Sequence, residues 1–198
     1  TVLFWPFADT RIAWSIISII DPIFTLGIIF GLILSIFRSS LLIAVLTLLF
    51  GLLYLSFGFY QNQRVQAEVY QIAMERNHAA ERVFVKPSFG NLIVWRTVYL
   101  HENRFYVDAI RAGRELRKFN GGSVKRFNIN VESERLKIPA LQLYDLRRFN
   151  WFTSNMLGVS KFYPDRVIDV RYSMLPNGLD PIWYLEFNND VQDDKHLT

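Results

Sequence analysis

Residues 39–60 read SSLLIAVLTLLFGLLYLSFGFY, a run without a charged side chain. A helix rises about 1.5 Å per residue, so this run is long enough to cross the roughly 30 Å hydrocarbon core of a bilayer. Tyr54 and Tyr60 lie toward one end, where amphipathic rings prefer the boundary between lipid and water. We therefore predict a membrane-spanning helix here.

The apolar run before it, residues 12–37, contains one charge, Asp21, which is followed by Pro22. An acidic residue before a proline is typical of a helix start, because the carboxylate caps free N–H groups and proline has none to lose. We predict a break before residue 22 and a second helix over 22–37. Residues 38–40 then form a tight turn, so that the two helices make a membrane hairpin.

The alternative is a buried helical hairpin in a large soluble protein. It fits less well, because two adjacent uncharged runs of this length are rare in water-soluble folds. The chain has 22 Lys and Arg and 18 Asp and Glu, but only Asp21 and Arg38 fall within residues 12–60. The other residues have the charge content of an ordinary soluble domain.

Composition excludes several classes of protein. Aromatic residues make up 16% of the chain, which is too many for a disordered protein. There is no cysteine, so disulfides, zinc–thiolate sites and cysteine nucleophiles are excluded. The net charge of +4 is spread without a basic tract, and we expect no nucleic-acid partner. The chain opens on Thr1 without a leader pattern, and we expect an N-terminal part to be missing.

Four segments follow from these patterns. We expect an interfacial approach segment at 1–21, the membrane hairpin at 22–60, an amphipathic connecting helix at 61–82, and a soluble α+β domain with an antiparallel sheet at 83–198. The connecting helix is indicated by apolar residues at helical spacing. Basic residues close to the hairpin favour a cytoplasmic domain; they are Arg64, Arg76, Arg82 and Lys86.

Within the domain, β-branched and aromatic runs predict strands at 91–100 and 105–110, a further strand at 123–131, and two more at 166–174 and 182–187. A helical pattern covers 139–157, with Gly158 as its C-cap. We predict two ion pairs, Arg96 with Asp108 across the hairpin and Asp169 with Arg171 along one strand.

The search for chemistry leaves few candidates. The three histidines, His78, His101 and His196, lack a second ligand at metal-binding spacing. A pocket lined by Trp95, Tyr106 and Tyr172 is conceivable, but core packing is the simpler role for these rings. Asp21 is an ionisable group in an apolar run, so it is either an N-cap at the membrane interface or a metal-binding or acid–base group. Asp9 pairs with Arg11 in the simplest interpretation.

Two groups of phrases together resemble a known family. The first group is FWPFADTR at residues 4–11 and IIDPIFT at 19–25. The second is VKPSFGNLIVWR at 85–96, FYVD at 105–108 and DVRYSMLP at 169–176. They resemble the YdjM-type, LexA-regulated inner-membrane proteins of bacteria, predicted metal-dependent hydrolases, with the match running from residue 3 to residue 187.

The resemblance implies a bacterial inner-membrane protein that binds a divalent metal ion, zinc included among the candidates. In that family the His- and Asp-bearing segments lie upstream of the Trp-Pro-Phe phrase. Here Asp9 and Asp21 fall on family-like acidic positions and are the metal-ligand candidates; the catalytic residues stay unknown. The partners implied are the lipid bilayer and upstream transmembrane segments of the same protein.

Two functions therefore remain open. The first is the C-terminal part of a membrane-bound, metal-dependent hydrolase acting on a lipid-linked or phosphate-bearing substrate, with residues 1–198 inert on their own. The second is a non-enzymatic interaction or sensor module anchored by the hairpin. The absence of any catalytic motif in the soluble block favours the second.

Overall fold

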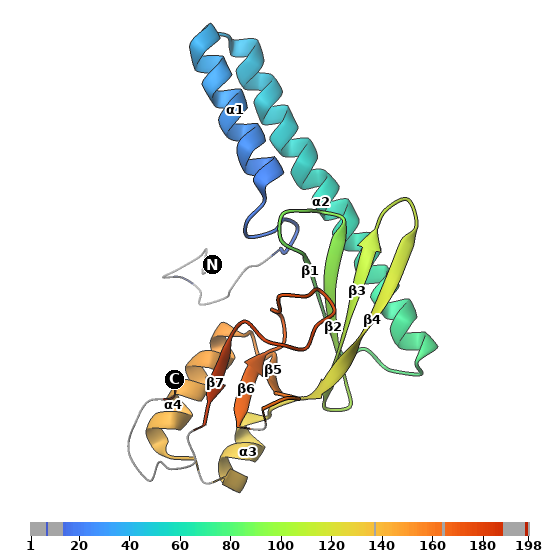
Figure 1. The fold of residues 1–198 in the computed structure, drawn as a ribbon, viewed down its shortest axis with the longest axis vertical. Coiled ribbons are helices and arrows are strands. Elements are labelled where there is room, and N and C mark those ends of the chain that lie inside the picture. The colour runs from blue at the N-terminus through green and yellow to red at the C-terminus, as the bar shows by residue number, and fades with distance from the viewer. Residues whose placement is uncertain (1–6, 8–13, 137, 164, 188–196, 198) are drawn as a thin grey trace.

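The computed structural model describes residues 7, 14–136, 138–163, 165–187 and 197. Two helices form a hairpin that projects from an α+β domain (Figure 1). They are α1, Pro22–Arg38, and α2, Leu41–Glu75, and α2 continues past the hairpin into the domain. The expected fold class, a helical hairpin followed by a small α+β domain with an antiparallel sheet, is confirmed.

The ends of α1 are set by local sequence. Asp21 is the N-cap, and its Oδ1 accepts a hydrogen bond from the backbone N–H of Phe24 at 3.1 Å. Ser39 adopts the left-handed conformation with φ of 45°, and its N–H closes the helix on the carbonyl of Ile36 at 3.1 Å. The predicted break before Pro22 and the predicted turn at 38–40 are therefore confirmed. Residues 14–21 form no helix.

Small residues bring the two helices of the hairpin close together. A Cβ atom at Gly31 would collide with the side chain of Thr47, and one at Gly27 would collide with the ring of Phe50. Many of the large apolar side chains of both helices point outward, and Phe37 and Leu41 are 83% and 80% exposed. The hairpin therefore has a seam in which small residues face side chains of the other helix, and a wide apolar outer surface.

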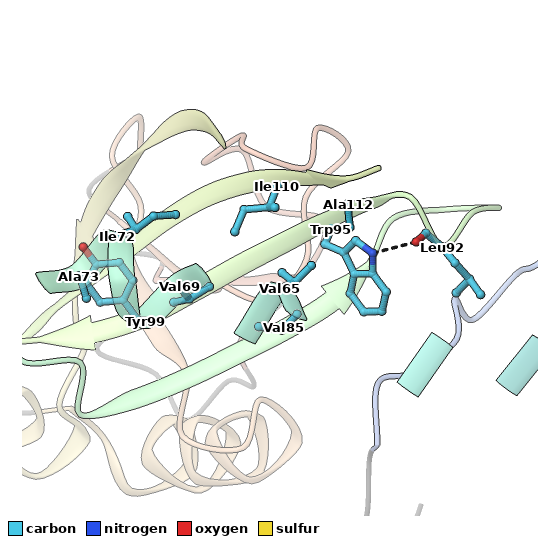
Figure 2. Packing of buried hydrophobic residues seen from close by; sticks show 10 residues of the cluster. All are labelled: Val65, Val69, Ile72, Ala73, Val85, Leu92, Trp95, Tyr99, Ile110 and Ala112. Atoms are coloured by element: carbon cyan, nitrogen blue, oxygen red, sulfur yellow. Dashed lines mark hydrogen bonds between the residues drawn. The ribbon is translucent and has the colours of Figure 1, made fainter. Parts of the chain in front are cut away.

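The second half of α2 packs against the domain. Val65, Val69, Ile72 and Ala73 lie at helical spacing and are buried on the sheet, as the periodicity predicts. Figure 2 shows them over the sheet residues of the same cluster, among them Trp95, whose indole Nε1 donates to the carbonyl of Leu92 at 2.9 Å. One continuous helix thus joins the hairpin to the core of the domain.

The connecting helix is shorter than the predicted segment 61–82. It ends at Glu75, and Asn77 turns the chain with φ of 57°. Residues Arg82–Pro87 then form a strand, β1, which the sequence analysis did not predict. The reason is tertiary, because β1 pairs along its whole length with the next strand, from Arg82 opposite Leu100 to Pro87 opposite Trp95.

The main sheet is antiparallel with the order β1-β2-β3-β4. The remaining strands are β2, Val94–His101, β3, Arg104–Ala112, and β4, Leu116–Lys125. The β2–β3 hairpin is as predicted, with Glu102 and Asn103 at positive φ in its turn. The strand predicted at 123–131 is right only for residues 123–125, the end of β4, and wrong beyond Lys125, because α3, Ile129–Leu136, follows.

A smaller unit covers the other face of this sheet (Figure 1). It contains α4, Ala140–Phe152, and a sheet with the order β5-β6-β7. Its strands are β5, Leu157–Val159, β6, Arg166–Asp169, and β7, Tyr184–Glu186. The core between the two sheets includes Val98, Phe105 and Val107 on one side and Met156 and Ile168 on the other.

The helix and the two strands predicted in the C-terminal part of the chain are present, but each is shorter than predicted. The helix expected over 139–157 ends at Phe152, because Ser154 and Asn155 adopt positive φ of 54° and 61° and turn the chain. Gly158 is therefore not a C-cap; it lies within β5, packed against Val170 and Val124. The strands expected at 166–174 and 182–187 shorten to β6 and β7.

Candidate anion-binding pocket

Asp21 is buried at the base of the hairpin, with 3% of its surface exposed. Besides the cap to Phe24, its Oδ1 and Oδ2 accept from the hydroxyl of Tyr54 in α2 at 2.9 and 2.8 Å. The Tyr54 ring in turn packs against Phe24 and Phe50. Asp21 is thus the predicted N-cap, and it also fastens the start of α1 to α2.

These contacts decide whether Asp21 is available to bind the metal ion that the family resemblance implies. Both Asp21 oxygens already accept hydrogen bonds, and no group of three His, Cys, Asp or Glu side chains gathers anywhere in the described part of the chain. The described residues around Asp21 therefore do not fit a divalent-metal centre. Asp9, the other ligand candidate, and Arg11 lie outside the described residues, so the metal site stays a prediction.

The two predicted ion pairs have opposite outcomes. Asp169 and Arg171 do pair, with Nη2 2.7 Å from Oδ2. Arg96 and Asp108 do not, because they lie on opposite faces of the sheet: Arg96 is opposite Ala109, while Asp108 is opposite Thr97. A shift of one residue along a strand changes the face. Asp108 instead binds Arg76, which follows α2, with Nη1 2.7 Å from Oδ2.

The aromatic residues considered for a pocket are also separated. Trp95 is buried under α2, and Tyr106 stacks on Tyr99 beside His78, whose ring lies 4.3 Å from that of His101. His196 lies outside the described residues. Only Tyr172 lines the cavity described next.

A pocket of about 200 Å³ lies between the end of β1 and the loop that follows β6. Its chemistry comes from three basic residues and two serines. No acidic residue is among its lining, which is Lys86, Pro87, Ser88, Phe89, Arg96, Arg171, Tyr172, Ser173, Met174, Pro176 and Ile182 within the described chain. Its walls come from two distant parts of the sequence, residues 86–96 and residues 171–182.

Arg96 forms part of one wall and is 5% exposed. Its Nη1 donates to the carbonyls of Leu175, Pro176 and Gly178, and its Nε and Nη2 donate to that of Val170. Within the described residues, no carboxylate accepts from it. Burial lowers the pKa of Arg96 to about 10, although the charge of Asp169 opposes this. The guanidinium is thus a buried cation that carbonyl dipoles solvate and that forms no salt bridge with any carboxylate in the described chain.

Lys86 is directly opposite Arg96 in the pairing of β1 with β2. Like charges in directly opposed strand positions are destabilising. The Lys86 Nζ lies 3.9 Å from the centroid of the Tyr172 ring, and none of the described residues accepts a hydrogen bond from it. Burial, followed by the charge of Arg96, lowers the pKa of Lys86 to about 8. This ammonium group is therefore partly desolvated and forms no salt bridge with a described residue, although the charge of Asp169 opposes the lowering of its pKa.

Two serines with buried hydroxyls are also among the residues that line the pocket. Among the described residues, the Oγ atoms of Ser88 and Ser173 are buried and have no hydrogen-bond partner. Buried polar groups are nearly always satisfied, so an orphan hydroxyl calls for an explanation such as a ligand or a water molecule. Here the two hydroxyls belong to residues that line the same cavity as Lys86 and Arg96.

The charges in and around the pocket do not balance. Asp169 is fully buried, and its carboxylate is occupied by Arg171, which donates to it from Nε, Nη2 and the backbone N–H. Lys86 and Arg96 are left as excess positive charge. Ammonium and hydroxyl donors around a small cavity suit an anion with several acceptor oxygens, such as a phosphate or a carboxylate. Chemically, the site can hold an anion.

The pocket was not found from the sequence, because Lys86 and Ser88 reach Tyr172 and Ser173 only through the packing of two sheets. Comparison of the chain with family models, with curated proteins and with solved structures finds no match. The resemblance to the YdjM-type family therefore stays a prediction, and the functional argument rests on geometry.

Proposed function

We propose that this chain is a membrane-anchored, non-enzymatic binding module: the hairpin inserts in a bilayer, and the α+β domain binds an anionic ligand in the pocket at Lys86. This is the second of the two functions that the sequence leaves open. The observation that carries it is the Lys86–Arg96 pair, which forms no salt bridge with a described carboxylate, beside two serine hydroxyls that have no hydrogen-bond partner among the described residues.

The membrane part of the proposal rests on the exposed apolar side chains of α1 and α2. Within the described residues, α2 alone is long and apolar enough to cross a bilayer; α1 is apolar but has 17 residues. A core helix of a soluble protein is mostly buried, whereas the outer surfaces of both helices are exposed. Uncovered apolar area of this extent is unfavourable in water and favourable in lipid. Basic residues beyond the hairpin favour a cytoplasmic domain at a bacterial inner membrane.

Anion binding is tested on the full chain in detergent micelles, with inorganic phosphate as the probe and ³¹P NMR titration as the readout. We expect saturable binding that the Lys86→Met variant weakens about tenfold, the value of a lost charge-assisted hydrogen bond. A Ser88→Ala/Ser173→Ala double variant removes the hydroxyl donors and should also weaken it. Thermal melting of each variant checks that the fold is retained.

Lys161→Met is the matched control, because Lys161 is an exposed lysine that does not line the pocket. It removes the same charge and should leave the titration unchanged. Equal phosphate affinity for the wild-type chain and the Lys86→Met variant contradicts the proposed pocket.

The hydrolase stays a prediction from the family resemblance. It requires bound divalent metal in the protein, and loss of that metal in the Asp21→Asn variant would place Asp21 among its ligands. Asparagine is also a good N-cap, so this substitution preserves the start of α1.

A further inference from the structure

Resting on the proposed function, we infer that the anion is the phosphate group of a membrane lipid, held in the Lys86 pocket while its acyl chains stay in the bilayer. Three features of the described chain carry this inference. They are the attachment of the pocket to the base of the hairpin, the apolar residues at its mouth, and its small volume.

The pocket is attached to the base of the hairpin through the β1–β2 loop. Phe89 lines the pocket, and the backbone N–H of the next residue, Gly90, donates to the carbonyl of Ile20 at 3.0 Å. Gly90 also faces Pro22, the first residue of α1, and a Cβ there would lie 3.4 Å from its ring. Figure 1 shows this loop beside the start of α1. The pocket mouth therefore lies next to the point where α1 enters the membrane.

Because α1 is short, the residues that precede it and the adjoining β1–β2 loop should lie close to the lipid. Its 17 residues span about 25 Å, less than the roughly 30 Å hydrocarbon core. A short span is accommodated by local thinning of the bilayer or by burial of flanking apolar groups. Ile19 and Ile20, which precede α1, are 72% and 61% exposed and are apolar enough to lie at that boundary. The adjoining β1–β2 loop then reaches the headgroup layer.

The mouth of the pocket is apolar and its interior is basic. Phe89 from the β1–β2 loop and Met174 from the loop after β6 both line it, and they are 52% and 74% exposed. Leu175, next to Met174, is exposed as well. Large apolar side chains around a cationic cavity suit a ligand whose charged group enters the cavity while its hydrocarbon part contacts the rim. A lipid has that arrangement, and a free anion does not.

The volume limits how much of the lipid enters. Pockets for drug-sized ligands are typically about 300–1,000 Å³, and this one is about 200 Å³. It can take a phosphate group and cannot take acyl chains. Basic pockets at a membrane surface are a known means of binding phosphate-bearing headgroups. A terminal phosphate, as in phosphatidic acid, presents the most oxygens to Lys86 and the two serines.

The experiment compares a lipid with water-soluble anions on the same full-length chain in detergent micelles. Native mass spectrometry and ³¹P NMR measure binding of dihexanoyl phosphatidic acid, glycerol 3-phosphate and inorganic phosphate. We expect the lipid to bind at least about tenfold more tightly than either soluble anion, since it adds rim contacts. Lys86→Met should weaken binding of all three probes.

A rim variant separates the lipid inference from the pocket itself. Phe89→Ser should weaken binding of the lipid and leave binding of glycerol 3-phosphate unchanged, because it removes apolar contact and no charge. Phe162→Ser is the matched control, since Phe162 is 58% exposed and does not line the pocket. Thermal melting confirms folding of each variant.

The outcomes distinguish the two claims. Equal affinity for the lipid and the soluble anions, or an unchanged lipid affinity in Phe89→Ser, overturns the lipid inference and leaves the anion pocket standing. Absence of binding for all three probes overturns both. Lipid binding that depends on Lys86 and Phe89, with weak binding of free phosphate, supports both.

Discussion

Lys86 and Arg96 place two positive charges side by side on a sheet, with no described carboxylate accepting from either. The carbonyls of Val170 and three loop residues take the hydrogen bonds of Arg96, while Lys86 lies over the Tyr172 ring. Cation–π contact compensates a desolvated ammonium only in part. Two adjacent positive charges of this kind repel each other, and such an arrangement is expected where a bound anion supplies the compensating negative charge.

The first prediction concerns pH. Because the pKa of Lys86 is about 8 in the folded chain and ordinarily 10.5, phosphate binding should fall as pH rises through about 8. Between those pH values the unfolded chain binds more protons, so the free energy of unfolding should rise with pH over the same window. Titration and chemical unfolding at pH 7 to 10.5 measure both. A profile identical in the Lys86→Met variant would contradict this assignment.

A second prediction concerns Tyr54, whose hydroxyl donates to both oxygens of Asp21. Among the described residues, Tyr54→Phe leaves the buried carboxylate with the Phe24 N–H as its one hydrogen-bond donor, and it should destabilise the hairpin by about 1–3 kcal/mol. Unfolding of the detergent-solubilised chain by SDS titration measures the change. Tyr60→Phe is the control, because Tyr60 is exposed and has no hydrogen bond to another described residue. Equal stability of both variants would show that the Asp21 contact is not important.

At the level of elements, prediction succeeded where the signals are local. Asp21-Pro22 and Ser39 set the ends of α1, and Val65, Val69 and Ile72 set the buried face of α2. It failed where contacts distant in sequence decide the local structure. β1 is a strand because it pairs with β2. The helix predicted over 139–157 stops at Phe152, because Ser154 and Asn155 adopt positive φ. Residues 152–157 contain no glycine or proline that would have marked this turn.

The Asp108 pairing shows why side-chain partners are harder to predict than elements. The β2–β3 hairpin was expected, but its register puts Asp108 on the α2 face and Arg96 on the other. A hairpin predicted correctly in outline therefore gives the wrong partner when its register is one residue off. Metal ligands and pocket residues share this difficulty, since each depends on several such registers at once.

A third prediction tests that register by double-mutant cycles. Arg76→Met with Asp108→Asn should show a coupling energy of about 1–3 kcal/mol, because the two side chains make two hydrogen bonds, at 2.7 and 3.0 Å. The pair Arg96→Met with Asp108→Asn should be additive within about 0.5 kcal/mol. Urea unfolding of the full chain in detergent measures each corner of the cycle. Coupling of Arg96 to Asp108 would contradict the observed register.

At the scale of the whole molecule, two bodies of different chemistry share one helix. The hairpin is apolar on its outside, and the domain buries its apolar residues between α2 and two sheets. The pocket lies within the domain, between the end of β1 and the loop after β6, and its Phe89 is followed by Gly90, which contacts the start of the hairpin. The sequence predicted the hairpin, the α+β domain and the buried face of the connecting helix, but it did not predict the pocket, because the pocket walls come together only in the assembled domain.

The fourth prediction is that the chain behaves as an integral membrane protein. It should remain in the membrane pellet after extraction with alkaline carbonate and be released by detergent, since the exposed side chains of α1 and α2 favour lipid. A fluorescent protein fused to the C-terminus should fluoresce in bacterial cells if the domain is cytoplasmic. Recovery of the chain in the carbonate supernatant would contradict membrane insertion.

The unbroken course of α2 has a mechanical consequence. Its 35 residues form a rod of about 52 Å, fixed to α1 at one end and to the four-stranded sheet at the other. A rod of that length converts a change in tilt of about 10° into a displacement of about 9 Å at its far end. Whatever alters the tilt of the hairpin, bilayer thickness included, must swing the sheet through the same angle. The orientation of the domain is thus coupled, through α2, to the tilt of the hairpin in the membrane.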